Sequence, residues 1–357
     1  MKGNTISELS KGTTQARWPR LRRSVRSLGV AAAVIVALTP SGLGAGIASA
    51  EKTSATPSSG CAATPAAPGS TIEQFAAAGR SGTYIRDVPR DAPGPRPVVL
   101  DLHGYMEPAA IAHASSGFGD YGASHGFITV TPQIEEPGLP RWNFQPGSTD
   151  IDWIAQLIDH VESTLCVDTR RVFVTGLSMG AFTTSSLGCQ LSDRIAAIAP
   201  VAGVQDFAWC TTSRPVPVIA FHGTADPIIA YTGGAGPNAR LLPAPDGTGS
   251  SVGTQREGPA VNGPGPASVP DSMAGWARRN GCETTPARQP VAPDVYRESY
   301  PCPADADVEL YSIQGGGHVW PGNTSVPFPE IFVGSNTTSI NATQLIWDFF
   351  EAHPLPE

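Results

Sequence analysis

The stretch Val172-Phe173-Val174-Thr175-Gly176-Leu177-Ser178-Met179-Gly180 decides the fold of this 357-residue chain. Its first four residues are β-branched or aromatic, which is typical of a buried strand, and a helical pattern follows from Met179 to Leu191. With 39 glycines in the chain, the Gly-X-Ser-X-Gly pattern alone is weak, and a Gly-rich turn without chemistry is the alternative. At a strand-to-helix turn, however, it is typical of a nucleophile elbow and predicts that Ser178 is a catalytic nucleophile.

Working outward, short apolar runs alternate with helical patterns along most of the chain. This alternation predicts an α/β fold, with a mostly parallel sheet flanked by helices on both faces. The residues 232–270 are rich in Gly, Pro and Ser and predict a long excursion of undefined role. Further strands are predicted at 97–102, 127–130, 195–201, 216–221 and 308–313, and further helices at 151–165 and 342–353.

A serine hydroxyl needs a base, and His318 is the best candidate among the three histidines that follow Ser178. It lies in a glycine-rich loop directly after the late strand, which can lay an imidazole across the mouth of an active site. His353 lies among Pro and Leu near the end of the chain, and His222 is interpreted as a structural residue of its own loop. The order Ser, acid, His is the order of catalytic groups in α/β-hydrolases.

The acid is predicted at Asp226, in a turn at the end of the strand 216–221 and directly before Pro227. There it can hold His318 in the correct tautomer and stabilise the imidazolium. Asp206 is the main alternative and Asp246 a more distant one.

Backbone N–H groups are expected to stabilise the oxyanion. Met179 supplies one at a helix N-terminus, and Tyr105 supplies the second in the loop after an early strand. The preceding His103 is interpreted as a scaffold residue. Trp142 and Trp320, together with Tyr105, are candidates for stacking on a phenolic acyl group, with plain packing as an equal alternative.

The first 50 residues have the pattern of a signal peptide. A basic region precedes an uncharged run from Leu28 to Thr39, and Ala48-Ser49-Ala50 is a typical cleavage site. The run is too short to span a bilayer, so no membrane anchor is expected after cleavage; whether export uses the general or the twin-arginine route stays open. Residues 51–70 predict a flexible lead-in, and 71–357 a catalytic domain.

Export would change the charge and the chemistry of the cysteines. Loss of residues 1–50 leaves 16 basic and 30 acidic residues, a surface that disfavours nucleic acid and anionic membranes. All six cysteines lie in the exported part, which predicts disulfides in a secreted, extracellular protein. The pairing stays open, with Cys282–Cys302 preferred because the intervening stretch is short. Their spacing does not suggest a metal site.

These motifs together resemble the esterases of the polyhydroxybutyrate-depolymerase type, which include secreted feruloyl esterases. The resemblance implies an α/β-hydrolase fold, a Ser178-Asp226-His318 triad and ester hydrolysis through an acyl-enzyme without metal or cofactor. Implied substrates are feruloyl and acetyl esters of plant cell walls or short hydroxyalkanoate esters. The segments that carry the resemblance are Leu102-His103-Gly104, Trp142-Asn143, Arg171 to Gly180, Phe221 to Pro227 and Gly315 to Gly322.

We therefore expect an esterase that is a monomer, and three alternative functions remain. A depolymerase acting on insoluble polyester is disfavoured because the chain ends soon after its last predicted helix, where such enzymes usually continue into a binding domain. A serine peptidase of the same fold would use the same triad. A catalytically silent binding protein is disfavoured by the intact Ser178, Asp226 and His318.

Overall fold

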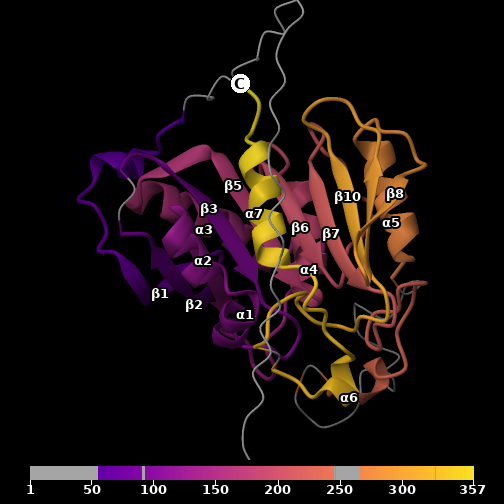
Figure 1. Ribbon diagram of the computed structural model, residues 1–357. Helices are drawn as coiled ribbons and strands as arrows, with labels where there is room; N and C mark the ends of the chain where they lie inside the picture. The colour runs from indigo at the N-terminus through magenta and orange to yellow at the C-terminus, as the bar shows by residue number, and fades with distance from the viewer. Residues whose placement is uncertain (1–54, 91–92, 245, 247–265, 326) are drawn as a thin grey trace, which may run out of the picture. The chain divides into compact units, whose positions relative to one another are not determined.

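The structure is a computed structural model, and it describes residues 55–90, 93–244, 246, 266–325 and 327–357 (Figure 1). The predicted signal peptide at 1–50 lies outside the described residues, as do residues 247–265 of the Gly/Pro/Ser-rich stretch. In the described part of the chain, no helix is both long enough and apolar enough to cross a membrane.

Ten strands of the described chain form one sheet in the order β1-β2-β4-β3-β5-β6-β7-β10-β9-β8. The six central strands, β4 to β10 in this order, run parallel, while β1, β2, β9 and β8 pair antiparallel at the two edges. The mostly parallel α/β-hydrolase sheet expected from the sequence is therefore confirmed. The strands are β1 (Gly69–Ala77), β2 (Arg80–Val88), β3 (Arg96–Leu102), β4 (Ile128–Ile134), β5 (Val167–Leu177), β6 (Ala197–Val201), β7 (Val218–Gly223), β8 (Ala287–Ala292), β9 (Val295–Tyr300) and β10 (Val308–Ile313).

Helices cover both faces of this sheet because its central strands are apolar on both sides. Successive side chains of a strand point to opposite faces, so Val172 and Val174 of β5 enter one core, and Phe173 enters the other. Helices α3, α4 and α5 pack in the first core, and α2 and α7 in the second, with α7 in front of the sheet in Figure 1. The helices are α1 (Ala109–Ser116), α2 (Phe118–His125), α3 (Thr149–Thr164), α4 (Met179–Gln190), α5 (Val269–Arg279), α6 (Glu330–Val333) and α7 (Ala342–Ala352), with short 3-10 turns η1 (Ser59–Ala62) and η2 (Ala239–Leu241).

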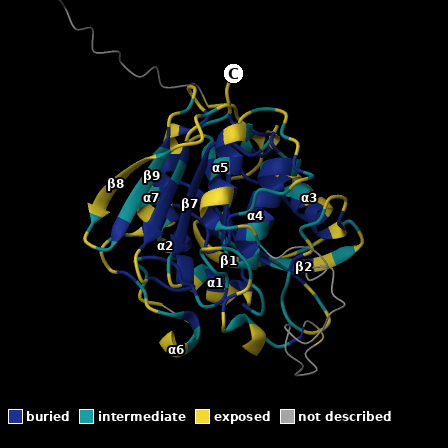
Figure 2. Cartoon of the chain, turned by 90° about the vertical axis from the view of Figure 1, so that its right-hand side faces the viewer, coloured by how far each residue is buried: buried dark blue, intermediate teal, exposed yellow. Residues whose placement is uncertain are grey.

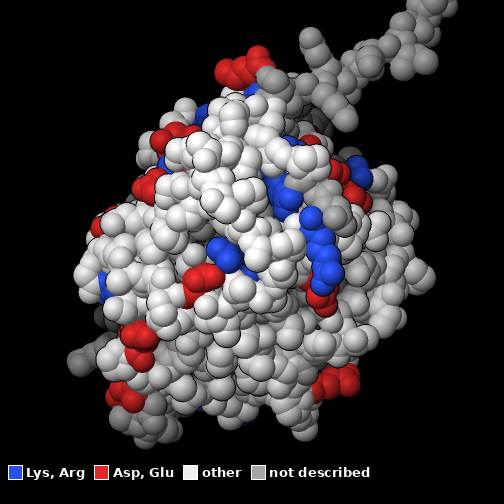
Figure 3. Space-filling view, turned by 90° about the vertical axis from the view of Figure 1, so that its left-hand side faces the viewer, with Lys and Arg blue, Asp and Glu red and all other residues white. Residues whose placement is uncertain are grey.

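Burial follows the position of a strand in the sheet. Figure 2 shows the central strands as buried, whereas β8 at one edge is mostly exposed. On the face drawn in Figure 3, acidic and basic side chains of the described residues are interspersed and separated by uncharged surface. This face shows no continuous area of one sign among the described residues.

Part of the expected flexible lead-in is attached to the fold. The Ser58 N–H donates to the Val167 carbonyl oxygen at 2.9 Å, and its hydroxyl donates to the Leu165 carbonyl oxygen at 2.9 Å. A disulfide between Cys61 and Cys166 lies directly beside these bonds. The attachment differs from the lead-in that the composition of residues 51–70 predicts, because backbone pairing and a covalent bond are not visible in composition.

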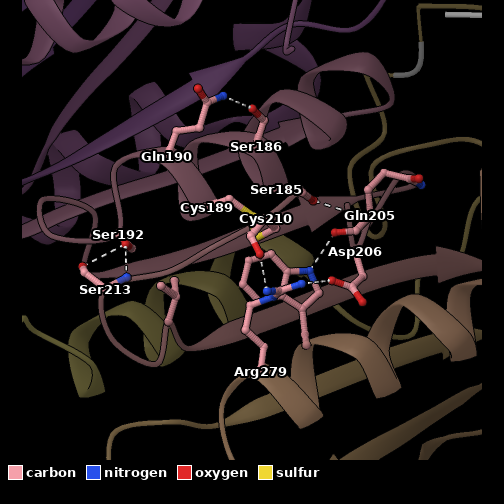
Figure 4. Close-up of a disulfide and its surroundings, with 12 residues drawn as sticks. Ser185, Ser186, Cys189, Gln190, Ser192, Gln205, Asp206, Cys210, Ser213 and Arg279 are labelled. Atoms are coloured by element: carbon pink, nitrogen blue, oxygen red, sulfur yellow. Dashed lines mark hydrogen bonds and ion pairs between the residues drawn. A yellow bond between two sulfur atoms is a disulfide. The ribbon is translucent and has the colours of Figure 1, made fainter. Parts of the chain in front are cut away.

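All six cysteines form disulfides, and the preferred pair Cys282–Cys302 is confirmed. The third disulfide, Cys189–Cys210, joins α4 to the loop after β6 (Figure 4). Arg279 of α5 donates to the Cys210 carbonyl oxygen at 2.6 Å and pairs with Asp206 on the same loop. The loop is thus fixed to two helices that flank the sheet.

Candidate active site

Ser178 stands between β5 and α4 in a conformation that few residues adopt. Its φ is 60° and its ψ is −118°, and its N–H donates to the Val201 carbonyl oxygen at 2.9 Å. A positive φ in a non-glycine residue costs free energy and persists where the surroundings enforce it. Gly180 allows this turn to approach β3, because an added Cβ there would lie 2.1 Å from the Leu102 carbonyl oxygen.

His318 and Asp226 lie side by side after neighbouring parallel strands. Asp226 follows β7 and His318 follows β10, and the His318 Nδ1 atom lies 2.8 Å from Asp226 Oδ2. The other carboxylate oxygen, Oδ1, accepts the N–H groups of Ile228 and Ile229 at 2.8 and 2.9 Å. The carboxylate is therefore held by two backbone donors while it faces the imidazole.

A second histidine contacts the same carboxylate. The His222 Nε2 atom lies 3.2 Å from Asp226 Oδ2 and 3.0 Å from the Ile229 carbonyl oxygen. Burial by itself would raise the pKa of Asp226, but the charge of His318 and the hydrogen bonds from His222 and His318 hold that pKa below its ordinary value. Asp226 is therefore ionised at neutral pH.

Ser178 and His318 line one cavity at the carboxyl ends of the parallel strands. The fold thus brings the three predicted catalytic residues to the same edge of the sheet, where ligands bind in open α/β folds. The other candidate acid and base have different partners. Asp206 pairs with Arg279, and His353 lies 2.6 Å from Asp307. Other walls of the cavity are formed by Leu177, Ile228, Leu242, Val319, Phe328, Phe332 and Val333.

The two expected oxyanion donors lie at this edge as well. Met179 is the first residue of α4, where the helix dipole favours negative charge, and Tyr105 lines the cavity. The Met179 side chain accepts the Trp142 N–H at 3.3 Å, and the Tyr105 hydroxyl donates to the Pro243 carbonyl oxygen at 2.8 Å. Both residues are thus fixed through groups other than the N–H that would bind an oxyanion.

The two tryptophans occupy different positions. Trp320 lines the cavity, although it is buried and its indole N–H donates to the Thr343 hydroxyl at 2.9 Å. Trp142 is buried, stacks on His103 at 4.6 Å and donates to the His103 carbonyl oxygen, and it is not among the residues that line the cavity. This placement favours packing over substrate contact for Trp142.

His103 has the environment of a scaffold residue. It is fully buried, and its Nδ1 atom lies 2.8 Å from the Gly104 carbonyl oxygen. Burial lowers the pKa of His103 to about 4, so the ring is neutral at pH 7. Because a ring N–H must face the carbonyl, the ring and its stacked tryptophan stiffen the start of the loop that carries Tyr105.

Glu107 and Ser115 are cavity residues that the sequence motifs did not indicate. Glu107 accepts the Gly104 N–H at 2.8 Å through Oε2 and is 2% exposed, and Ser115 is 4% exposed. The only feature of the sequence that could have indicated Glu107 is its position, three residues after Gly104, which follows the predicted strand at 97–102. Among the described residues, no group of three or more His, Cys, Asp or Glu side chains is placed to hold a metal ion.

The mostly parallel sheet flanked by helices gives this chain the α/β-hydrolase fold. A solved acetyl xylan esterase from Aspergillus awamori has the same fold, with a TM-score of 0.53 and 15% identity over 79% of this chain and 100% of that one. At this identity the likeness concerns the fold alone.

The chain is also similar in sequence to a feruloyl esterase and to a polyhydroxyalkanoate depolymerase. It is 28% identical to feruloyl esterase B of Piromyces equi over 62% of this chain and 39% of that enzyme. It is 34% identical to poly(3-hydroxyalkanoate) depolymerase C of Paucimonas lemoignei over 33% of this chain and 30% of that enzyme. The matches confirm the resemblance to feruloyl esterases and polyhydroxyalkanoate depolymerases. The chain spans well under half the length of these relatives, and no family model matches it.

Proposed function

We propose that this chain is a serine esterase that hydrolyses carboxylic esters through an acyl-enzyme. The observation that carries the proposal is that Ser178, at its strained turn, lines the same cavity as His318, whose Nδ1 faces the Asp226 carboxylate at 2.8 Å. Similarity to a feruloyl esterase and to a polyhydroxyalkanoate depolymerase supports ester hydrolysis over peptide hydrolysis.

In this mechanism Ser178 attacks the ester carbonyl and His318 takes the hydroxyl proton at Nε2. Asp226 holds the Nδ1–H tautomer and stabilises the imidazolium. The N–H groups of Met179 and Tyr105 bind the oxyanion, and the imidazolium gives its proton to the leaving alcohol. Water, deprotonated by His318, then attacks the acyl-enzyme, and Ser178 is released with its proton restored.

The substrates proposed are feruloyl or acetyl esters of plant polysaccharide, or short hydroxyalkanoate esters. We further propose that residues 71–357 form the catalytic domain of an exported protein. Pairing of all six cysteines in disulfides supports export to an oxidising compartment.

The test is the Ser178→Ala variant assayed on p-nitrophenyl acetate. We expect hydrolysis to fall to the background rate and labelling by a fluorophosphonate probe to be lost, with thermal unfolding nearly unchanged. Ser213→Ala is a matched control, since Ser213 bonds to Ser192 and does not line the cavity. Wild-type activity in Ser178→Ala would exclude the proposed nucleophile. Comparing rates on methyl ferulate and on an aminoacyl anilide separates an esterase from a peptidase.

A further inference from the structure

The cavity beside Ser178 contains two buried polar side chains that the proposed mechanism does not use. Glu107 lies in the loop after β3, and Ser115 lies in the last turn of α1. Both line the cavity, and both are more than nine-tenths buried. Most of the other side chains that line the cavity are apolar, so Glu107 and Ser115 place polar groups on an otherwise mostly apolar wall.

Each of the two residues has an oxygen without a hydrogen-bond partner among the described residues. The Oε2 atom of Glu107 accepts the Gly104 N–H, but its Oε1 atom has no partner, and neither has the Ser115 hydroxyl. Leaving such groups unpaired in the interior costs about 1–3 kcal/mol each, so native proteins usually satisfy them. An unpaired acceptor and an unpaired hydroxyl on the wall of a cavity can both be satisfied by a polar group that enters the cavity.

The two residues are close to each other and to the nucleophile. Burial raises the pKa of Glu107, while the Gly104 N–H, His318 and the nearby Ser115 hydroxyl act against that rise. The Ser115 hydroxyl thus faces the Glu107 carboxyl group as a donor, although the two groups do not reach full hydrogen-bond geometry. A Cβ placed on Gly104 would lie 3.0 Å from Glu107 Oε2 and 3.5 Å from Ser178 Cβ, so the carboxyl group and the nucleophile both lie close to Gly104.

We propose that Glu107 and Ser115 form a subsite that binds a hydroxyl group carried by the substrate close to its ester bond. A hydroxyl both donates and accepts, so it pairs with Ser115 and with either protonation state of Glu107. A methyl group in the same place would leave both residues unpaired, which is the kind of mismatch that polar sites reject. The subsite deepens the proposed esterase function and rests on it.

The test compares esters that differ only by hydroxyl against methyl. One arm places the group on the acyl side, with methyl 3-hydroxybutanoate against methyl 3-methylbutanoate. The other places it on the alcohol side, with 2-hydroxyethyl butanoate against propyl butanoate. Acid release is followed at constant pH, and the ratio of kcat/KM values within each pair reports the preference independently of overall catalytic power.

We expect the wild type to prefer the hydroxylated ester in one arm, and Ser115→Ala to lower that ratio about three- to tenfold. The ratio within each ester pair is the readout for Ser115→Ala, whatever its absolute rate on the methyl partner. Glu107→Gln should keep most of the preference, because its amide oxygen still accepts the Gly104 N–H and its NH2 group can donate to the substrate hydroxyl. The matched control is Ser116→Ala, because Ser116 is equally buried but bonds to Asp101 and does not line the cavity.

Ratios that are the same in the wild type and Ser115→Ala in both arms would overturn the subsite. So would a stronger preference for methyl 3-aminobutanoate than for the hydroxy ester, since that result indicates a site for a cation. If Ser115→Ala unfolds, Ser115→Cys keeps the volume and removes most of the hydrogen bonding. Failure of the folded wild type to hydrolyse any of these esters would instead count against the proposed function.

Discussion

The His318 Nδ1 atom and the Asp226 Oδ2 atom lie 2.8 Å apart, and the same oxygen receives the His222 ring at 3.2 Å. An ionised carboxylate only accepts, so His318 must present Nδ1–H to it and keep its lone pair on Nε2. That tautomer is the one that can take a proton from Ser178. The relationship between the two residues therefore determines which nitrogen performs the chemistry.

The first prediction concerns Asp226→Asn. The amide keeps the shape of the carboxylate but removes its charge, so it neither stabilises the imidazolium nor enforces the tautomer of His318. We expect kcat on p-nitrophenyl acetate to fall about 10⁴-fold, by analogy with other Ser-His-Asp enzymes. Asp206→Asn is the control, because Asp206 is a carboxylate paired with Arg279, and its kcat should stay within a few-fold of wild type. A larger loss of kcat in Asp206→Asn than in Asp226→Asn would identify Asp206 as the catalytic acid.

The second prediction concerns His222, which contributes to the low pKa of Asp226. In His222→Leu the carboxylate loses a donor, so its pKa should rise towards its ordinary value. We expect kcat to fall about tenfold, the equivalent of one hydrogen bond to a charged group, with little change in KM. His222→Gln, which can still donate an N–H, should recover part of the loss. Equal losses in both variants would indicate a packing role instead.

Much of the central sheet could be predicted from sequence because its strands are buried on both faces. Continuous apolar runs such as Val172 to Val174 and Val218 to Phe221 are typical of strands that are buried on both faces of a parallel sheet. The predicted strand at 308–313 coincides with β10, and the helix predicted at 342–353 coincides with α7 to within one residue. The order of nucleophile, acid and base along the chain followed from the order of these strands.

The edge strands could not be predicted in the same way. All but the last of the β8 residues are exposed. The first four residues of β1 are exposed and the rest alternate between half-buried and exposed, so neither strand has a buried apolar run. Their pairing depends on partners elsewhere in the fold. In the site, the sequence motifs did not indicate Glu107, and His222 was interpreted as a structural residue of its own loop. The positions of both residues depend on which loops meet in the fold, and a sequence motif contains no information on that.

The third prediction ranks two disulfides by the loops that they close. Cys61–Cys166 joins residues 105 apart in sequence, and Cys189–Cys210 joins residues 21 apart. In a chain-entropy model the first restricts the unfolded chain more, by roughly 4.8 against roughly 3.4 kcal/mol. We therefore expect the Ser double variant of the first pair to lose more free energy of unfolding in urea. A larger loss for the second pair would mean that native-state contacts of the loop after β6 dominate.

The fourth prediction uses Asp101, a buried carboxyl group at the end of β3 that bonds to the Ser116 hydroxyl. Burial raises its pKa from 3.8 to about 7, against the effect of that hydroxyl. Between these values the folded protein holds a proton that the unfolded chain has lost, so this group makes stability fall as pH rises.

Asn cannot titrate, so comparing Asp101→Asn with the wild type isolates the pH dependence of stability that comes from the proton on Asp101. Relative to wild type, the variant should gain free energy of unfolding as pH rises from 4 to 7, by up to about 4 kcal/mol. Urea unfolding of both proteins at the two pH values measures the change, and the other titrating groups cancel in the comparison. A difference between the proteins that stays constant across this range would mean that Asp101 is ionised in the folded state, with Ser116 and its surroundings stabilising the charge.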